Sequence, residues 1–371
     1  MRDQFKKAFE NLDKEQFKIR EIVVADEDCY LITPNSIGAK WNKENIIFRS
    51  AIITKNFEPV SIGYKKFVNW LESPDLDPAP KSLNGCSVVD KLDGSALYFS
   101  LYKNNLIVRT RGTYDARALE TGDEIDGLLA KNHRIAAWLR LAADKNGTAP
   151  YTILTEWYSP RNIIVLRYGE EPKLWLTNIV NHSDYSYTKQ PDLDVLAIDL
   201  GLERPATYYF DSIEDMLKIG QELTGKEGYC VYYNDYQSIR KHKAIRYLAL
   251  HKLKSELSSS EKVLDLWLEL NRPGYKDFYD YVSTTFDFEI AEQIRGDISK
   301  ICDAAKEMRN ILDGMERFVY KIKELPTRKE QAVAITGAYG ETNRAGFLFS
   351  ILDGKPLEKD NYKKLIFQII K

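Results

Sequence analysis

Residues 95–112 read SALYFSLYKNNLIVRTRG, two runs rich in apolar, β-branched and aromatic residues on either side of Asn104 and Asn105. Such runs favour β-strands, and the two asparagines between them are typical of a hairpin turn. Similar runs recur as far as about residue 250: YLITP (30–34), NIIFRSAIIT (45–54), YTILTEWY (151–158), IIVLRY (163–168), KLWLTNIV (173–180) and YCVYYND (229–235). This part of the chain is therefore predicted to be α+β, with mainly antiparallel sheets.

Two helices are predicted within the same region. The first opens the chain, where Phe5, Phe9 and Leu12 recur among charged residues with the spacing of an amphipathic helix. The second covers about residues 129–145 and is closed by Asn146-Gly147.

From about residue 245 the strand-like runs stop and helical periodicity takes over. Ser258 with Glu261, and Thr327 with Glu330, have the spacing of capping boxes. We therefore expect two domains, an α+β domain over residues 1–250 and an all-helical C-terminal domain over residues 251–371.

The composition is that of an ordinary globular protein. The 371 residues include 53 Lys and Arg against 55 Asp and Glu, a net charge of −2. This balance excludes a uniformly basic nucleic-acid coat protein but leaves room for a local basic groove. No disulfide framework or zinc site is expected from the scattered cysteines, and no signal peptide or membrane span from the apolar pattern, so we expect a cytoplasmic protein with no membrane partner. The cysteines are Cys29, Cys86, Cys230 and Cys302.

The string Lys91-Leu92-Asp93-Gly94 stands directly before the run SALYFSLY. KxDG is the nucleophile motif of the covalent nucleotidyltransferases, in which the lysine attacks a nucleotide phosphate. A string this short also arises by chance, and the alternative interpretation is a solvated turn.

Further charged residues follow the order seen in those enzymes. Glu156 lies in an apolar strand, where by itself it would be interpreted as a surface carboxylate of an edge strand. The basic stretch KHKAIRYLALHK (241–252) would by itself be a solvated turn leading into a helix. In chain order the set is Arg49, Lys66, Glu156, Glu227, Arg240, Lys241 and Lys243.

Together these pieces resemble the RNA ligase 1 family of T-even bacteriophages, ATP-dependent RNA ligases of the covalent nucleotidyltransferase superfamily. The blocks that carry the resemblance are FRSAIITKNFEPVSIGYKKFVNW (48–70), EWYSPRNIIVL (156–166), KEGYCVYY (226–233) and KHKAIRYLALH (241–251). Two residues depart from the family pattern: Ser50 replaces a glycine, and Arg111 in VRTRG replaces a lysine. A guanidinium is not equivalent to an ammonium at a phosphate site.

The resemblance implies a nucleotidyltransferase domain of ATP-grasp-like antiparallel sheets with flanking helices, followed by the helical domain, which is associated with RNA specificity. It also implies three steps. A lysine takes AMP from ATP, AMP passes to the 5′-phosphate of an RNA, and a 3′-hydroxyl then attacks that end and seals the strand.

The resemblance further implies a role for each matching residue. Catalysis would fall to Lys91, Lys241 and Lys243. Glu227 and Asp93 would hold Mg²⁺, with Mn²⁺ as an alternative. Trp175 is a candidate to flank the adenine, although a tryptophan in a strand is more often part of the core. The nucleotide would be bound by Arg49, Lys66, Lys91, Asp93, Gly94, Arg111, Glu156, Glu227, Lys241 and Lys243.

Lys91 has to attack as a neutral amine, whereas an ordinary lysine has a pKa of about 10.4. We expect the cations Lys241 and Lys243, with a bound metal, to lower the pKa of Lys91. We also expect the basic residues to converge on one phosphate-binding cleft; they are Arg49, Lys66, Lys91, Arg111, Arg240, Lys241 and Lys243.

The partners implied by the resemblance are ATP and RNA, either single-stranded or a tRNA broken in its anticodon loop. A polynucleotide kinase-phosphatase would act in the same repair pathway, in a bacterial or phage-infected cell. Two alternatives stay open: another covalent nucleotidyltransferase, such as a DNA ligase or a capping enzyme, and a non-catalytic RNA-binding relative. The first is disfavoured because no run of short strands follows Lys243, the second because the set of charged residues is intact.

Overall fold

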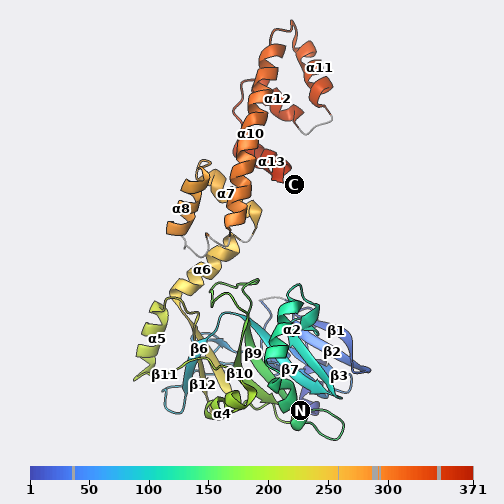
Figure 1. Cartoon of the computed structure of the whole chain (residues 1–371), viewed down its shortest axis with the longest axis vertical. Helices are drawn as coiled ribbons and strands as arrows, with labels where there is room; N and C mark the ends of the chain where they lie inside the picture. Colours follow the sequence, from blue (N-terminus) through green and yellow to red (C-terminus); the bar gives the residue numbers. More distant parts are fainter. Residues whose placement is uncertain (36–37, 258, 286–290, 292–293, 341–343, 371) are drawn as a thin grey trace. The chain divides into compact units, whose positions relative to one another are not determined.

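The structure is a computed structural model that describes residues 1–35, 38–257, 259–285, 291, 294–340 and 344–370 (Figure 1). The chain divides into two compact units, Met1–Ala249 and Leu250–Lys371, which are described separately. The first is a mixed α+β unit and the second is helical.

The first sheet of the α+β unit has the strand order β1-β2-β3-β4. Its antiparallel strands are β1 (Phe17–Val24), β2 (Glu27–Pro34), β3 (Ala51–Thr54) and β4 (Pro59–Ile62). Helix α1 (Arg2–Glu10) precedes it and buries Phe5 and Ala8, as the apolar spacing at the N-terminus predicts. A short 3-10 helix, η1 (Asn45–Arg49), precedes β3, so the predicted strand over 45–54 is confirmed only in its second half.

The second sheet has the order β10-β9-β7-β8, also antiparallel. Its strands are β7 (Ser95–Tyr102), β8 (Asn105–Thr110), β9 (Tyr151–Tyr158) and β10 (Lys173–Asn181). The predicted hairpin of β7 and β8 is confirmed, but its turn consists of Lys103 and Asn104, one residue earlier than predicted. Both residues have positive φ, as the tight turn between two antiparallel strands requires.

The third sheet has the order β11-β6-β12-β13-β5. Its strands are β5 (Val68–Asn69), β6 (Ser87–Lys91), β11 (Thr207–Tyr208), β12 (Gly228–Tyr233) and β13 (Ser238–Lys243). The short strand β5 pairs parallel to β13, and the other pairs are antiparallel.

Helices pack against all three sheets. Besides α1 and η1 the helices are η2 (Ala116–Ala118), α2 (Gly122–Lys131), α3 (Arg134–Leu141), α4 (Gln190–Leu200) and α5 (Ile213–Glu222). Helices α2, α3 and α4 share a core with the second sheet, and α5 packs on the third. One further core is built from all three sheets and includes Ile32, Ile53, Val89, Tyr98, Leu154 and Ile239.

The single helix predicted over 129–145 is wrong, because the chain forms α2 and α3 with a break between them. Asn132 causes the break: its backbone N–H and its side-chain amide both donate to the carbonyl of Leu128, which ends α2. Helices α4 and α5 were not predicted from the sequence. Ser212 caps α5 by accepting from the N–H of Asp215.

The second unit consists of helices around the long helix α10 (Arg295–Ile322), which contacts α7, α8, α12 and α13 (Figure 1). The helices that surround α10 are α7 (Ser260–Glu269), α8 (Tyr275–Thr285), α11 (Arg328–Tyr339), α12 (Ala345–Leu352) and α13 (Lys359–Ile370); α6 (Ile245–Glu256) crosses the boundary between the units. The predicted capping box of Thr327 and Glu330 is confirmed. Ser258 lies outside the described residues, and Ser259 caps α7 by accepting from the N–H of Lys262.

Among the described residues no helix is both long enough and apolar enough to cross a membrane.

Candidate active site

Strand pairing in the third sheet places the predicted nucleophile beside two other charged residues. Lys91 ends β6, and Gly228 at the start of β12 pairs with Lys91 on one side and Lys243 on the other. Glu227, directly before Gly228, is buried and accepts from Lys91 Nζ at 2.7 Å and from Lys243 Nζ at 2.8 Å. The result is a Lys91–Glu227–Lys243 triad built across three adjacent strands.

Gly228 has a φ of +144°, and a Cβ atom there would lie 2.0 Å from the carbonyl oxygen of His242. Only glycine fits this conformation and this close approach. The glycine therefore lets Glu227 and the two lysines lie within contact distance.

The pKa of Lys91 is raised above that of an ordinary lysine, contrary to the prediction. Burial is the largest single influence and lowers this pKa, but the attraction of Glu227, Cys230 and Glu156, together with the hydrogen bond to Glu227, outweighs it. Lys91 is therefore held as an ammonium ion in this structure. The prediction fails because the nearest charge is an anion rather than a cation, which only the strand register reveals.

The pKa of Lys241, in contrast, is lowered to about 7. Burial is the main cause, and the cations Arg49 and Lys91 add to it. Lys241 and Lys243 are two residues apart on β13, so their side chains lie on the same face of the sheet.

Several cations in this region form no ion pair with a described residue, although Glu72 attracts Lys66 and Lys241 from a greater distance. Among the residues that the structure describes, Arg49, Lys66 and Lys241 form no ion pair, and the buried Nη1 of Arg49 has no hydrogen-bond partner. Arg49 and Lys241 both stand over the ring of Phe67, at 4.5 and 5.7 Å from its centroid.

Lys66 belongs to the same group. Its pKa is lowered by burial and then by Arg49 and by Arg111, which is exposed at the end of β8. Unpaired, partly buried cations are costly unless an anion binds between them. We call Arg49, Lys66, Arg111 and Lys241 the cation cluster.

Glu156 lies on β9, between β7 and β10, so the interpretation as an edge-strand surface carboxylate is wrong. It accepts from the N–H of Gly94 at 3.1 Å, and burial raises its pKa to about 7 against the opposing effect of Lys91. A Cβ at position 94 would lie 2.5 Å from the carbonyl oxygen of Trp157. Gly94 thus allows the nucleophile loop to lie against β9 and meet Glu156.

Both carboxylate oxygens of Asp93 accept hydrogen bonds from other parts of the fold. One of its oxygens accepts from the N–H groups of Val165 and Leu166, at 2.7 and 2.6 Å, and the other accepts from the hydroxyl of Tyr247 at 2.7 Å. Its own N–H donates to the hydroxyl of Tyr168 at 2.9 Å. These bonds fix the nucleophile loop through Asp93, and its role as a metal ligand stays a prediction.

The same bonds explain why the strand predicted over residues 163–168 is not formed. The N–H groups of Val165 and Leu166 are used by Asp93 rather than by a neighbouring strand. Tyr168 and Tyr247 are site residues that the sequence reading did not assign. Tyr247 stands within the quoted block KHKAIRYLALH, but nothing in that string indicates a bond to Asp93.

Trp175 pairs with Glu156 across the sheet and is 8% exposed, with its ring edge-on to Tyr168 at 5.5 Å between centroids. The tryptophan is thus mostly core, with one neighbour in the site.

Arg240 does not join the cation cluster. It is buried, and its guanidinium donates to backbone carbonyls of the loop that follows β5. The acceptors are Asn69, Trp70, Glu72, Ser73 and Asp77. Arg240 and Lys241 are adjacent on a strand, so they point to opposite faces, and Arg240 fixes the loop instead of binding phosphate.

The described residues contain no group of three or more His, Cys, Asp or Glu side chains that could hold a metal ion. The remaining carboxylates of the site are Glu227 and Glu156. This donor set does not make an all-protein metal cage, but it fits Mg²⁺ that keeps its waters and is held together with substrate phosphates.

No family model matches the sequence, and no curated protein matches it. Solved structures that do resemble it include RNA and DNA ligases. A Naegleria gruberi RNA ligase with PPi is 15% identical with a TM-score of 0.37, over 45% of this chain and 51% of that chain, so the match spans about half of that ligase. A variant of that ligase with ATP and Mn is 13% identical with a TM-score of 0.42, over 68% of this chain and 83% of that one.

A putative ATP-dependent DNA ligase from Aquifex aeolicus is 14% identical with a TM-score of 0.45, over 96% of this chain and 100% of that chain. At such low identities and TM-scores, the likeness says nothing about substrate. The chemistry of this chain therefore has to be inferred from its own side chains.

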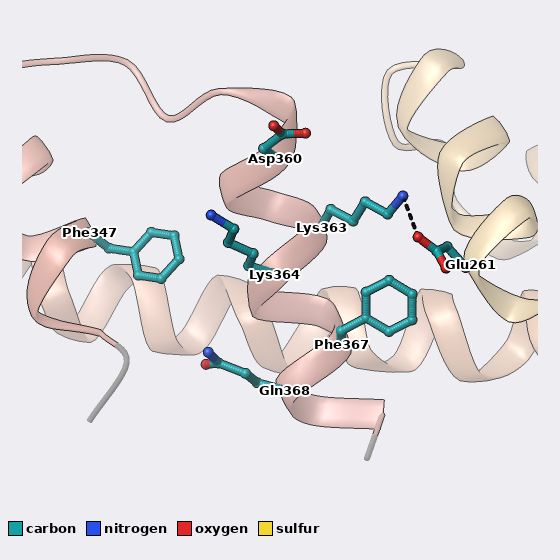
Figure 2. A pocket seen from close by; sticks show the side chains of 7 residues that line it. All are labelled: Glu261, Phe347, Asp360, Lys363, Lys364, Phe367 and Gln368. Atoms are coloured by element: carbon teal, nitrogen blue, oxygen red, sulfur yellow. Dashed lines mark ion pairs between the residues drawn. The ribbon is translucent and has the colours of Figure 1, made fainter. Parts of the chain in front are cut away.

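The helical unit contains an open cavity of about 760 Å³ whose charges are balanced (Figure 2). Lys363 in its wall pairs with Glu261 at 3.0 Å and with Asp265 at 2.8 Å. Figure 2 shows Lys363 reaching toward Glu261, while Lys364 points to the side of Phe347. The lining residues are Glu261, Phe347, Asp360, Lys363, Lys364, Phe367 and Gln368.

Proposed function

We propose that this chain is an ATP-dependent RNA ligase that joins 5′-phosphate to 3′-hydroxyl ends through a lysyl-AMP intermediate on Lys91. The observation that carries the proposal is the juxtaposition of the Lys91–Glu227–Lys243 triad with the cation cluster. A buried lysine beside cations that form no ion pair with a described residue suits a nucleophile that attacks a polyphosphate.

In the first step, Lys91 Nζ forms a bond to the α-phosphorus of ATP while the bond to the leaving pyrophosphate breaks. The amine must lose its proton, and Oε2 of Glu227, at 2.7 Å, is the acceptor already in contact with it. The triad keeps Lys91 charged and fixed in place before the reaction. Lys243 holds the other oxygen of Glu227 and so orients the carboxylate.

The cation cluster would bind the phosphates and stabilise the charge that develops on the leaving pyrophosphate. The cluster contains two lysines, which act as compact point charges, and two arginines, whose planar guanidinium can donate two parallel hydrogen bonds to a phosphate. Lys241 can be neutral in the free protein and charged in the complex, because its pKa of about 7 rises when an anion binds beside it.

The rest of the nucleotide would lie along β9 and β10. Glu156, whose pKa burial raises to about 7, can hydrogen-bond to the ribose hydroxyls. The rings of Tyr168 and Trp175 offer an apolar surface for the adenine. When bound, Mg²⁺ would neutralise phosphate charge, and Glu227 is the protein carboxylate best placed to hold its hydration shell.

Radiolabelled ATP tests the proposal directly. Purified protein incubated with α-labelled ATP and Mg²⁺ should become labelled at Lys91, whereas α-labelled GTP should leave it unlabelled. A 5′-phosphorylated single-stranded RNA should then be circularised, and the same DNA strand should react poorly. Labelling by GTP would indicate a capping enzyme, and preferential sealing of nicked DNA would indicate a DNA ligase.

We further propose that the helical unit supplies the RNA specificity. In its support, the described part of residues 250–371 is helical and contains none of the strands of an OB-type domain. RNA carrying a photoreactive uridine beside its 5′-phosphate should crosslink to residues of this unit as well as to the α+β unit. Crosslinks confined to the α+β unit would contradict the proposed role.

A further inference from the structure

A further buried arginine, Arg109, is linked to the backbone next to the cation cluster and forms no ion pair with a carboxylate among the described residues. Arg109 on β8 is fully buried, and burial lowers its pKa to about 10. Its Nε donates to the hydroxyl of Ser61 at 2.7 Å, its Nη1 to the hydroxyl of Ser50 at 2.5 Å, and its Nη2 to the carbonyl of Ser61 at 2.9 Å. The guanidinium also lies 4.7 Å from the centroid of the Tyr98 ring.

Burying a cation without an anion costs free energy, so such a group is retained where its hydrogen bonds perform a task. Arg109, on β8, donates to neutral acceptors on Ser61 of β4 and on Ser50 directly before β3. It therefore connects these two segments to β8. The residues that it joins stand directly next to members of the cation cluster: Ser50 follows Arg49, and Arg111 lies two residues beyond Arg109.

Ser50 is the connecting residue. It is fully buried, accepts from Arg109, and donates its hydroxyl proton to the carbonyl of Arg111 at 2.8 Å. The next carbonyl, of Gly112, accepts from the guanidinium of Arg20. The backbone of Arg111 is thus fixed to the backbone beside Arg49 through one serine hydroxyl, at the position where the similar family has a glycine.

The other end of the network leads away from the cluster. Ser61 accepts from Ser100 at 2.8 Å, Ser100 lies 2.9 Å from the hydroxyl of Thr152, and Thr152 lies 2.8 Å from Nε2 of His182. Burial lowers the pKa of His182 to about 3, so this end is neutral. Thr152 thus belongs to the same buried network, but none of its hydrogen bonds to described residues reaches Ser50, Arg49 or Arg111 directly.

We propose that Arg109 and Ser50 are positioning residues that hold Arg49 and Arg111 at a fixed spacing for a polyphosphate. The proposal rests on the proposed use of ATP. It assigns no proton transfer and no direct contact with the nucleotide to either residue. It predicts that the buried serine controls the affinity for the phosphates and leaves later chemistry unaffected.

The test compares Ser50→Ala with Thr152→Val, two small substitutions in one buried network. Ser50→Ala should raise the KM for ATP in self-adenylylation about tenfold, the change expected when a charge-assisted hydrogen bond is lost. Thr152→Val should lower the melting temperature about as much as Ser50→Ala does, but should leave the KM for ATP unchanged. Sealing of RNA that already carries a 5′-adenylate should be the same in both variants.

The KM for ATP of Arg109→Lys should lie between those of the wild type and Ser50→Ala, because an ammonium can reach one of the two serine hydroxyls but not both. The proposal is overturned if Ser50→Ala leaves the KM for ATP unchanged, or if Thr152→Val raises it equally. Calorimetric titration with tripolyphosphate separates this proposal from the ligase assignment. Wild-type protein that binds tripolyphosphate about tenfold more tightly than Ser50→Ala, yet is never labelled by ATP, would keep the positioning role and refute the proposed function.

Discussion

The cation cluster of the α+β unit and the lysines that line the cavity of the helical unit differ in how their charges are compensated. In the cavity of the helical unit, Lys363 lies between Glu261 and Asp265, and two lysines face two carboxylates along its lining. In the cation cluster, Arg49 and Lys66 form no ion pair among the described residues, and Glu72 attracts Lys66 only from beyond ion-pair distance. The charge of a lysine in an ion pair is already balanced by a carboxylate. The charges of the cation cluster are balanced only when an anion binds there.

The pKa directions show the same contrast. Hydrogen bonds to Asp265 and Glu261 raise the pKa of Lys363, while burial and neighbouring cations lower that of Lys241 to about 7. Both residues are lysines on regular secondary structure, so the difference comes from their surroundings. The cluster is therefore the region where nucleotide chemistry is expected, and the balanced cavity is not.

The largest effect is expected at the nucleophile. Lys91→Ala should reduce label transfer from ATP to background, because no other lysine can replace the atom that bonds to phosphorus. Lys91→Arg is the matched control, since it keeps a cation beside Glu227 but cannot form the phosphoramidate. Both variants should melt cooperatively, and a labelled Lys91→Arg protein would show that another residue is the nucleophile.

A smaller loss is expected from the cation cluster. Lys241→Met should slow self-adenylylation by about 100-fold, as is typical when one group that stabilises transition-state charge is removed. RNA binding by the same variant, measured by fluorescence anisotropy, should weaken far less. Equal losses in the two measurements would indicate a general phosphate-binding surface instead of a catalytic cluster.

Local sequence pattern was sufficient to predict the strands of the second sheet. Residues 95–102 and 151–158 were predicted as strands and form β7 and β9, because apolar and aromatic side chains fill both faces of these central strands. Residues 163–168 have a similar composition but form no strand, since their N–H groups bond to Asp93. That competition depends on a residue about 70 positions earlier, which no local pattern reveals.

The candidate site shows the same limit. Motif order named Lys91, Glu227 and Lys243, and the register of β6, β12 and β13 brings them together. The direction of the Lys91 pKa was predicted incorrectly, because it depends on a contact across strands. The buried roles of Arg240 and Arg109 were likewise not predicted, since a charged residue in a strand gives no sign of which face it occupies.

A finer measurement follows from the pKa of Lys241. Its pKa of about 7 lies below that of an ordinary lysine, so at pH 8 the amine is mostly neutral, and an anion bound beside it raises the pKa. Binding of an ATP analogue with a non-cleavable α–β bridge should therefore take up a fraction of a proton at pH 8. At pH 5.5, where Lys241 is already charged, this uptake should vanish.

Calorimetry in buffers of different ionisation enthalpy gives the number of protons. Lys241→Arg, which keeps the charge at every pH, is the matched control and should lack the uptake at pH 8. An uptake that persists in this variant would mean that another group titrates when the analogue binds.

The smallest effect is expected in the helical unit. Lys363→Met should leave self-adenylylation within about twofold of the wild type and lower the free energy of unfolding by less than about 1 kcal/mol, because ion pairs near the surface contribute little. Denaturant unfolding measures the second quantity, and labelling by ATP measures the first. The counterpart in the cluster is Lys66→Met, which removes a lysine that forms no ion pair with a described residue and should reduce labelling much more than stability. If Lys363→Met instead lost as much labelling as Lys66→Met, ion pairing would not distinguish the two regions, and the balanced cavity would have to take part in the chemistry.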